Sequence, residues 1–304
     1  MDYEIDNKSK EDDVLIEELN SFFFLCDENF LKDRYLEKII ITNDFDNNVR
    51  KYRNNKDYIS ERRVDNAIGI TIDIVNEYER KNIIILKKEL FSALPRDLKY
   101  QFLAHELDHC FNNMNLPNLI PSSYSKFLYL WLLKRIFDEY SAVRFSLNIF
   151  GNIFDNSRLE LINICFDSHI NQLNDPEIYL KPFLNEYQNF KEHKDNKILF
   201  KSIYPIIESL SINIFYMLAF LDSCGSHLNN SGSINVSLPF FNIEVIEIWK
   251  IIQRWMCSKN NNINYEEGIF EIINYISKIG FYFSNEGIDI LCHPLEYNLE
   301  KLNK

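Results

Sequence analysis

The chain has 304 residues, 46% of them hydrophobic, so it can form one large domain or two of ordinary size. Its 45 acidic residues outnumber 33 lysines and arginines, which argues against a nucleic-acid-binding protein, because contacts to phosphates require a basic surface. Only 7 residues are glycine and no phosphate-binding loop motif occurs, which excludes most kinases, ATPases and dehydrogenases.

The N-terminal part of the chain predicts a small sheet with helices. Residues 1–12 are charged, and we expect no regular structure there. The apolar spacing then predicts a helix, a strand, a helix capped by Asp44, and two strands, in that order. These elements cover residues 14–24, 39–42, 44–53, 67–75 and 82–86. The last two strands can form a hairpin, and the strand 82–86 is a candidate edge for pairing with an extended peptide.

Everything beyond Pro95 is predicted to be helical. The expected helices cover residues 95–113, 122–150, 157–172, 178–191, 197–222, 242–257 and 264–281, with a loop at 223–241. The predicted fold class is therefore α+β and mostly helical, with a small β-sheet N-lobe and a helical C-terminal region. We divide it into an N-terminal helical extension (1–36), a metal-binding catalytic domain (37–150) and a helical C-terminal region (151–304).

Two further features suggest a cytoplasmic protein. The N-terminus is acidic where a signal peptide would be basic, and the apolar run 212–221 is about half the length needed to span a bilayer. The six cysteines are scattered and form no Cys-x-x-Cys pair, so we expect free thiols. Cys224 and His227 form a lone Cys-x-x-His, which without a second half-site is a weak metal signal.

Residues 105–109 read His-Glu-Leu-Asp-His. On a helix, positions four apart lie on one face, so His105 and His109 can offer two imidazoles to one tetrahedral ion. Zinc favours nitrogen ligands, a carboxylate oxygen and one open position for water. Glu106 lies about 100° around the helix from His105, where it can reach and activate such a metal-bound water. The pattern predicts zinc bound by both histidines, with Glu106 as the catalytic base. The alternative is a pair of histidines with a structural role in the core.

The rest of this helix fits a site with a core side and a ligand side. An apolar stripe lies opposite the histidines and consists of Leu103, Leu107, Cys110, Phe111 and Met114. Asp108 lies off both faces, where it is either solvated or orients a metal ligand.

The third metal ligand is predicted on the next helix. Glu139 lies on an apolar face, where a carboxylate is costly unless it meets a cation or strong donors. A zinc ion would be such a partner, and an ion pair with Arg135, four residues earlier, is the alternative. Asp138 is the main rival to Glu139 as the ligand.

His105-Glu106-x-x-His109, followed on the next helix by Glu139-x-x-Ala142, resembles the gluzincin branch of the zincin metallopeptidases. The resemblance covers about residues 37–150, and the compact cytosolic zincins of bacteria and mobile elements look most similar. It implies a zinc peptidase in which Glu139 is the third ligand and the small Ala142 lets the second helix approach the first. The gap between His109 and Glu139 is longer than in thermolysin, and the aminopeptidase specificity elements are absent.

We therefore expect a zinc-dependent hydrolase that cleaves a peptide or protein substrate and acts on neither nucleic acid nor membrane. Tyr140, His169 and His227 are candidate transition-state donors by residue type, although a structural role is the simpler interpretation of each; His193 and His293 are expected at the surface. The alternative function is a non-proteolytic zinc-binding module, regulatory or partner-binding, of mobile-element or toxin-antitoxin type. Hydrolysis of a non-peptide amide is a further possibility.

Overall fold

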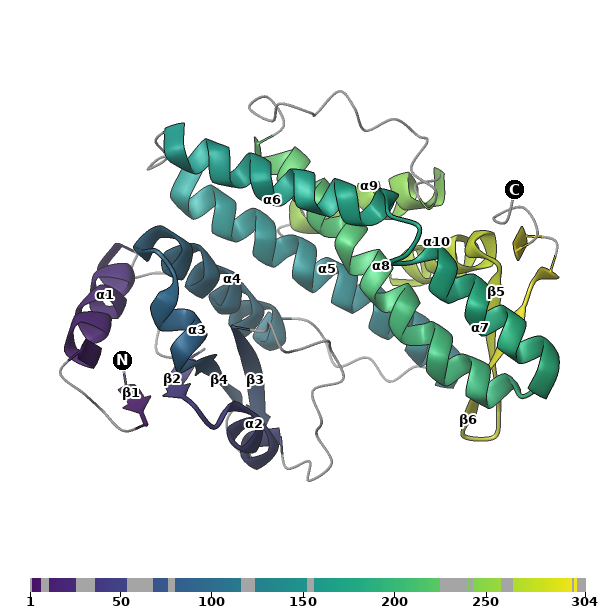
Figure 1. Ribbon diagram of the computed structural model, residues 1–304, viewed down its shortest axis with the longest axis horizontal. Helices are drawn as coiled ribbons and strands as arrows, with labels where there is room; N and C mark the ends of the chain where they lie inside the picture. The colour runs from purple at the N-terminus through teal and green to yellow at the C-terminus, as the bar shows by residue number, and fades with distance from the viewer. Residues whose placement is uncertain are drawn as a thin grey trace. The chain divides into compact units, whose positions relative to one another are not determined.

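The computed structural model confirms the α+β, mostly helical class (Figure 1). It describes residues 2–6, 11–25, 36–53, 68–75, 80–115, 124–151, 156–224, 240, 243–257, 265–296 and 298–299. Contacts divide the chain into two compact units, the first Met1–Pro117 with Phe145–Asn152 and the second Asn118–Arg144 with Ile153–Lys304. Residues 1–36 are thus grouped with the rest of the N-terminal part, and residues 118–144 are grouped with the later part of the chain.

The first unit contains a four-stranded mixed sheet in the order β1-β2-β4-β3. Its strands are β1 (Asp2–Ile5), β2 (Leu36–Thr42), β3 (Gly69–Val75) and β4 (Arg80–Lys87). β1, β2 and β4 are parallel, whereas β3 runs antiparallel to β4. The predicted β3–β4 antiparallel pairing is confirmed.

Two sequence predictions about this sheet are wrong. The N-terminal residues expected to lack regular structure include β1, which pairs with β2 and extends the sheet. The strand predicted at 82–86 is not an edge strand, because β4 pairs with β2 on one side and with β3 on the other. Within the described residues β3 pairs on one side only, so β3 is the edge strand on that side of the sheet.

Side chains alternate between the two faces of β3, as a pleated strand requires. Ile70, Ile72 and Ile74 pack with Phe45 and Val49 of α2 (Phe45–Arg53) in one apolar cluster. The intervening positions face α4 (Arg96–Asn115), which lies on the opposite face of the sheet from α2 (Figure 1). The two helices therefore cover the sheet from both sides.

α4 approaches β3 closely at Gly69. A Cβ atom there would lie 2.6 Å from Leu86 Cδ2, 2.8 Å from the Ile85 carbonyl oxygen and 3.1 Å from the ring of Phe102 on α4. The absence of a side chain at this position therefore lets the helix pack tightly on the strand pair. Deeper in the same interface the buried amide of Asn82 donates to the Cys110 carbonyl of α4, 3.2 Å away.

Two more helices complete the first unit. α1 (Glu11–Leu25) follows the predicted helix, and α3 (Lys88–Ala93) is a short helix that the sequence analysis did not predict. Lys88 pairs with the buried Asp12 at 2.9 Å, and Lys99 of α4 pairs with Glu18 at 2.7 Å. These ion pairs fix α1 to the elements that follow the sheet.

The second unit is built around helices that match the predicted ranges to within a few residues. They are α5 (Tyr124–Gly151), α6 (Asn156–Asn174), α7 (Leu180–His193), α8 (Asn196–Cys224), α9 (Ile243–Cys257) and α10 (Tyr265–Ile279). The last turns of α5, from Phe145, are grouped with the first unit. α8 packs against α6 and α7 and supplies many of the buried apolar side chains.

The prediction that everything beyond Pro95 is helical is wrong near the C-terminus. β5 (Phe281–Glu286) and β6 (Asp289–Pro294) form an antiparallel hairpin. Phe281 and Phe283 are buried whereas Tyr282 is 45% exposed, an alternation that belongs to a strand. Gly287 adopts a positive φ of 60° in the turn, which glycine tolerates best.

Among the described helices, α8 is long and apolar enough to cross a membrane by length and composition. In the structure 61% of its most apolar window is buried. This burial is what a core helix of a soluble protein shows.

Candidate metal centre

The two histidines of the motif meet on α4. Pro95 precedes the helix and its carbonyl accepts the Lys99 amide at 3.0 Å, so α4 begins where the sequence predicts. The Nε2 atoms of His105 and His109 lie 3.0 Å apart, and the two rings stand at 90° with centroids separated by 4.6 Å. Spacing by four residues has therefore brought two imidazole nitrogens together, as predicted.

This separation is close to what a shared metal ion would need. Two nitrogens bound tetrahedrally to zinc at the usual bond length lie roughly 3.3 Å apart. Without an ion, two neutral imidazoles at 3.0 Å share one hydrogen bond, in which one nitrogen donates and the other accepts. A small opening of the pair is enough to admit a metal ion.

Glu106 is buried beside the histidines and is held by the sheet. Glu106 is only 5% exposed, and the hydroxyl of Thr71 on β3 donates to Glu106 Oε2 at 2.7 Å. The same hydroxyl also lies 3.0 Å from the main-chain oxygen of Glu106. Thr71 therefore connects the edge strand to both the backbone and the carboxylate of the predicted base.

The apolar stripe of α4 is largely confirmed. Leu103, Leu107 and Cys110 are buried, whereas Phe111 is 41% exposed and so does not belong to the core. The Met114 side chain lies outside the described residues. Asp108, for which a solvated position was one expectation, is 4% exposed and therefore not solvated.

Glu139 is buried on α5, with 3% of its surface exposed. Two side chains of the second unit meet its carboxylate. Arg135 Nη2 lies 2.9 Å from Oε1, and the Tyr216 hydroxyl of α8 donates to Oε2 at 2.5 Å. The ion pair with Arg135, which was the alternative interpretation of Glu139, is thus present.

Arg135 is itself held between two acids. Its Nε lies 3.5 Å from Glu208 of α8, in addition to the contact with Glu139. Burial disfavours the charged guanidinium, but the two carboxylates outweigh this cost and raise the pKa of Arg135 above its ordinary value. Nη2 approaches Glu139 at ion-pair distance without making a directed hydrogen bond. Arg135 therefore acts on this carboxylate mainly as a positive charge.

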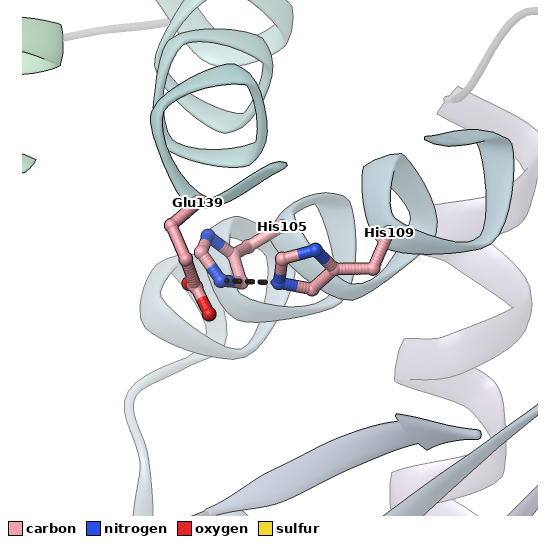
Figure 2. A group of neighbouring side chains, drawn as sticks. All are labelled: His105, His109 and Glu139. Atoms are coloured by element: carbon pink, nitrogen blue, oxygen red, sulfur yellow. Dashed lines mark hydrogen bonds between the residues drawn. The ribbon is translucent and has the colours of Figure 1, made fainter. Parts of the chain in front are cut away.

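His105, His109 and Glu139 form a group in which one potential ligand atom from each residue lies within 4.8 Å of the others (Figure 2). Among the described residues no other cluster of three His, Cys, Asp or Glu side chains has this character. Asp138, the rival ligand, is not part of the group. The group consists of the three residues of the predicted ligand set.

The candidate transition-state donors have other partners. The hydroxyl of Tyr140 donates to Asp222 of α8, and burial together with this carboxylate raises the pKa of Tyr140 to about 12. His169 Nδ1 lies 2.5 Å from Asn213 Oδ1. His227 lies outside the described residues. The structural interpretation therefore suits Tyr140 and His169.

The remaining histidines and cysteines make no second metal site in the described residues. His193 is exposed, as expected, whereas His293 is half-buried, and its Nε2 lies 2.7 Å from the Ser284 hydroxyl. Cys165, Cys224 and Cys292 are free thiols.

Sequence reasoning missed two polar residues at this site, Thr71 and Tyr216. Thr71 stands at a position between the isoleucines of an alternating strand, and Tyr216 stands in a long apolar helix, so neither belongs to a recognisable motif. Their partners lie 35 and 77 positions away in the sequence.

Comparison with family models, with curated proteins and with solved structures gave no match. The functional argument therefore rests on the residues of this chain and on their geometry.

Proposed function

We propose that this chain is a zinc-dependent hydrolase, a cytoplasmic metallopeptidase that cleaves peptide bonds. In this proposal His105, His109 and Glu139 hold the ion and Glu106 is the general base. The observation that carries it is the pair of imidazole nitrogens 3.0 Å apart, next to a buried glutamate in the His-Glu-x-x-His spacing.

The donor set suits zinc. Two imidazole nitrogens and one carboxylate oxygen are the three protein ligands of many catalytic zinc sites, which keep a fourth position open. A structural zinc site typically has a fourth protein ligand, often a cysteine, and no open position for water. Within the described residues no cysteine belongs to this group. The composition of the group therefore favours catalysis over a purely structural role.

When bound, zinc would polarise a substrate carbonyl and lower the pKa of a water molecule to about 7. Glu106 would then accept a proton from the attacking water and deliver it to the leaving amine. The Thr71 hydrogen bond to Oε2 restricts the rotation of this carboxylate, so the base would be oriented before substrate arrives. A purely structural site would gain nothing from a general base at this position.

An extended peptide can bind along β3. In the described part of the sheet, β3 pairs only with β4, and an unpaired strand edge can accept a peptide by strand addition. Thr71 belongs to this strand and contacts Glu106, so a peptide on the edge of β3 would lie close to the base. In this proposal the peptide pairs with β3 and not with the strand 82–86 (β4), which the sequence analysis had suggested.

The test separates metal binding from turnover. We expect about one zinc ion per chain by elemental analysis, and loss of that zinc in His105→Ala or His109→Ala but not in the exposed-residue control His193→Ala. The probe for activity is a complex peptide pool prepared from whole-cell protein, with new termini identified by mass spectrometry. Glu106→Gln should keep the zinc and generate no new termini.

Two results would overturn the proposal. Unaltered cleavage by Glu106→Gln would exclude Glu106 as the base, and a natural protein that binds no zinc would exclude the metal centre. Full zinc occupancy without cleavage of any peptide would instead favour the non-proteolytic regulatory module.

A further inference from the structure

Glu139 would enter the proposed metal centre with a carboxylate that already has two defined partners. Arg135 lies beside Oε1, and the Tyr216 hydroxyl donates to Oε2 at 2.5 Å. The two contacts differ in kind, because Arg135 contributes charge whereas Tyr216 makes a short, directed hydrogen bond. A single charge nearby lowers the cost of burying a carboxylate but does not fix its rotation.

Tyr216 is itself restrained by neighbouring aromatic and polar side chains. The ring of His169 on α6 packs against it, with centroids 5.4 Å apart and planes at 47°. His169 is held by Asn213, whose amide nitrogen donates to the Tyr179 hydroxyl at 3.2 Å. This second bond orients the amide so that its oxygen faces His169, which therefore donates from Nδ1.

The result is a continuous chain of contacts, all within the second unit, that ends on a predicted metal ligand. It runs from Tyr179 through Asn213, His169 and Tyr216 to Glu139. Burial lowers the pKa of His169, so its ring is neutral near pH 7 and packs without a charge to solvate. Each member limits the movement of the next.

We propose that Tyr216 is a positioning residue of the metal centre, which fixes the Glu139 carboxylate in the orientation that metal binding needs. This inference rests on the proposed function. Side chains that hydrogen-bond a metal ligand orient it, and their loss commonly lowers metal affinity by about 10- to 100-fold. The Tyr216 hydroxyl donates its one hydrogen to Glu139 and so does not donate to substrate at the same time. Tyr216 therefore acts through the predicted ligand.

The probes are Zn²⁺ and Co²⁺ alone, with affinity measured by competition against a chromophoric chelator. Tyr216→Phe keeps the ring that packs on His169 and removes only the hydroxyl, and we expect it to bind both metals about 10- to 100-fold more weakly. The matched control is Tyr204→Phe on the same helix, because the buried Tyr204 hydroxyl has no hydrogen-bond partner among the described residues. That variant should bind metal as the natural protein does.

A double-mutant cycle shows whether Tyr216 acts through Glu139. In Glu139→Ala, which lacks the carboxylate, adding Tyr216→Phe should change the affinity no further. The visible absorption of bound Co²⁺ gives a second measurement, since it should differ between Tyr216→Phe and the natural protein. Circular dichroism of the metal-free variants establishes that affinities are compared between folded proteins.

The possible outcomes separate this inference from the proposed function. Natural protein that binds neither metal contradicts the metal centre itself. If the natural protein binds metal, and Tyr216→Phe binds it with the same affinity and the same Co²⁺ spectrum, the positioning role is contradicted. The metallopeptidase proposal then remains intact. An equally large affinity loss in the Glu139→Ala background would mean that the hydroxyl acts on the fold and not on the ligand.

Discussion

The two helices that contribute the predicted ligands hold them by different means. On α4 the histidines are one turn apart and meet each other at 3.0 Å, so the geometry follows from helical spacing. On α5 the single predicted ligand, Glu139, is held by Arg135 and by Tyr216, which is 77 positions away in the chain. One half of the site is therefore encoded locally and the other depends on tertiary packing.

This difference has an energetic consequence. Imidazoles are neutral when they bind metal, so the α4 pair can be buried at modest cost before an ion arrives. A buried carboxylate such as Glu139 must be compensated at all times, and Arg135 provides that compensation when no metal is bound. Substitutions around α5 should therefore affect folding as well as metal binding, and those around α4 chiefly the chemistry.

The largest effect is expected for Arg135→Met. This change leaves two buried or half-buried acids, Glu139 and Glu208, without their cation, and we expect a loss of about 3–5 kcal/mol in the free energy of unfolding. Urea unfolding measures it. Lys181→Met breaks an exposed pair of the same spacing with Glu177 and should cost no more than about 0.5 kcal/mol. Equal losses in the two variants would contradict the compensating role of Arg135.

An intermediate effect is expected for Thr71→Val. The substitution keeps the shape of the side chain but removes the hydroxyl that donates to the Glu106 carboxylate. A hydrogen bond to a charged group contributes about 1.5–3 kcal/mol, so unfolding should become easier by about that amount. Thr71→Ser retains the hydroxyl and should recover most of the loss. If Thr71→Ser is as unstable as Thr71→Val, the methyl group and not the hydroxyl is responsible.

The smallest effect concerns pH. Burial lowers the pKa of His169 below 6.5, so the unfolded chain binds a proton more readily than the folded protein does. The stability contributed by neutral His169 is fully present above pH 6.5 and is lost as pH falls toward the folded-state value. Unfolding curves of His169→Gln and the natural protein, recorded from pH 7.5 to 5, should converge at acidic pH. Curves that keep the same separation over this pH range would contradict the contribution of His169.

The parts of the site that the sequence could predict are those with a local signal. The two histidines and Glu106 lie within five residues of one regular helix. Glu139 was identified because a lone acid on an apolar helix face needs a partner. Thr71 and Tyr216 could not be found in this way, because their partners are distant in the chain and their own surroundings are ordinary. Nothing in one strand or one helix reveals which hydroxyl will meet which carboxylate.

The fold shows the same limit. Long helices with regular apolar spacing were predicted to within a few residues, whereas β1 and the β5–β6 hairpin were missed. β1 has only four residues and two of them are acids, so its strand character comes from pairing with β2. The position of β4 inside the sheet is likewise set by its neighbours, since a buried apolar run looks the same whether or not another strand lies beyond it.

The N-terminal strand β1 also has a protective role. It covers the outer edge of β2, where Ile39, Ile40 and Ile41 form an uninterrupted run of fully buried β-branched side chains. A version of the chain that starts at Glu11 would leave this edge of β2 open, and an open strand edge is a template for self-association. We therefore expect removal of the first ten residues to promote self-association, although these residues are not among those proposed to carry the chemistry.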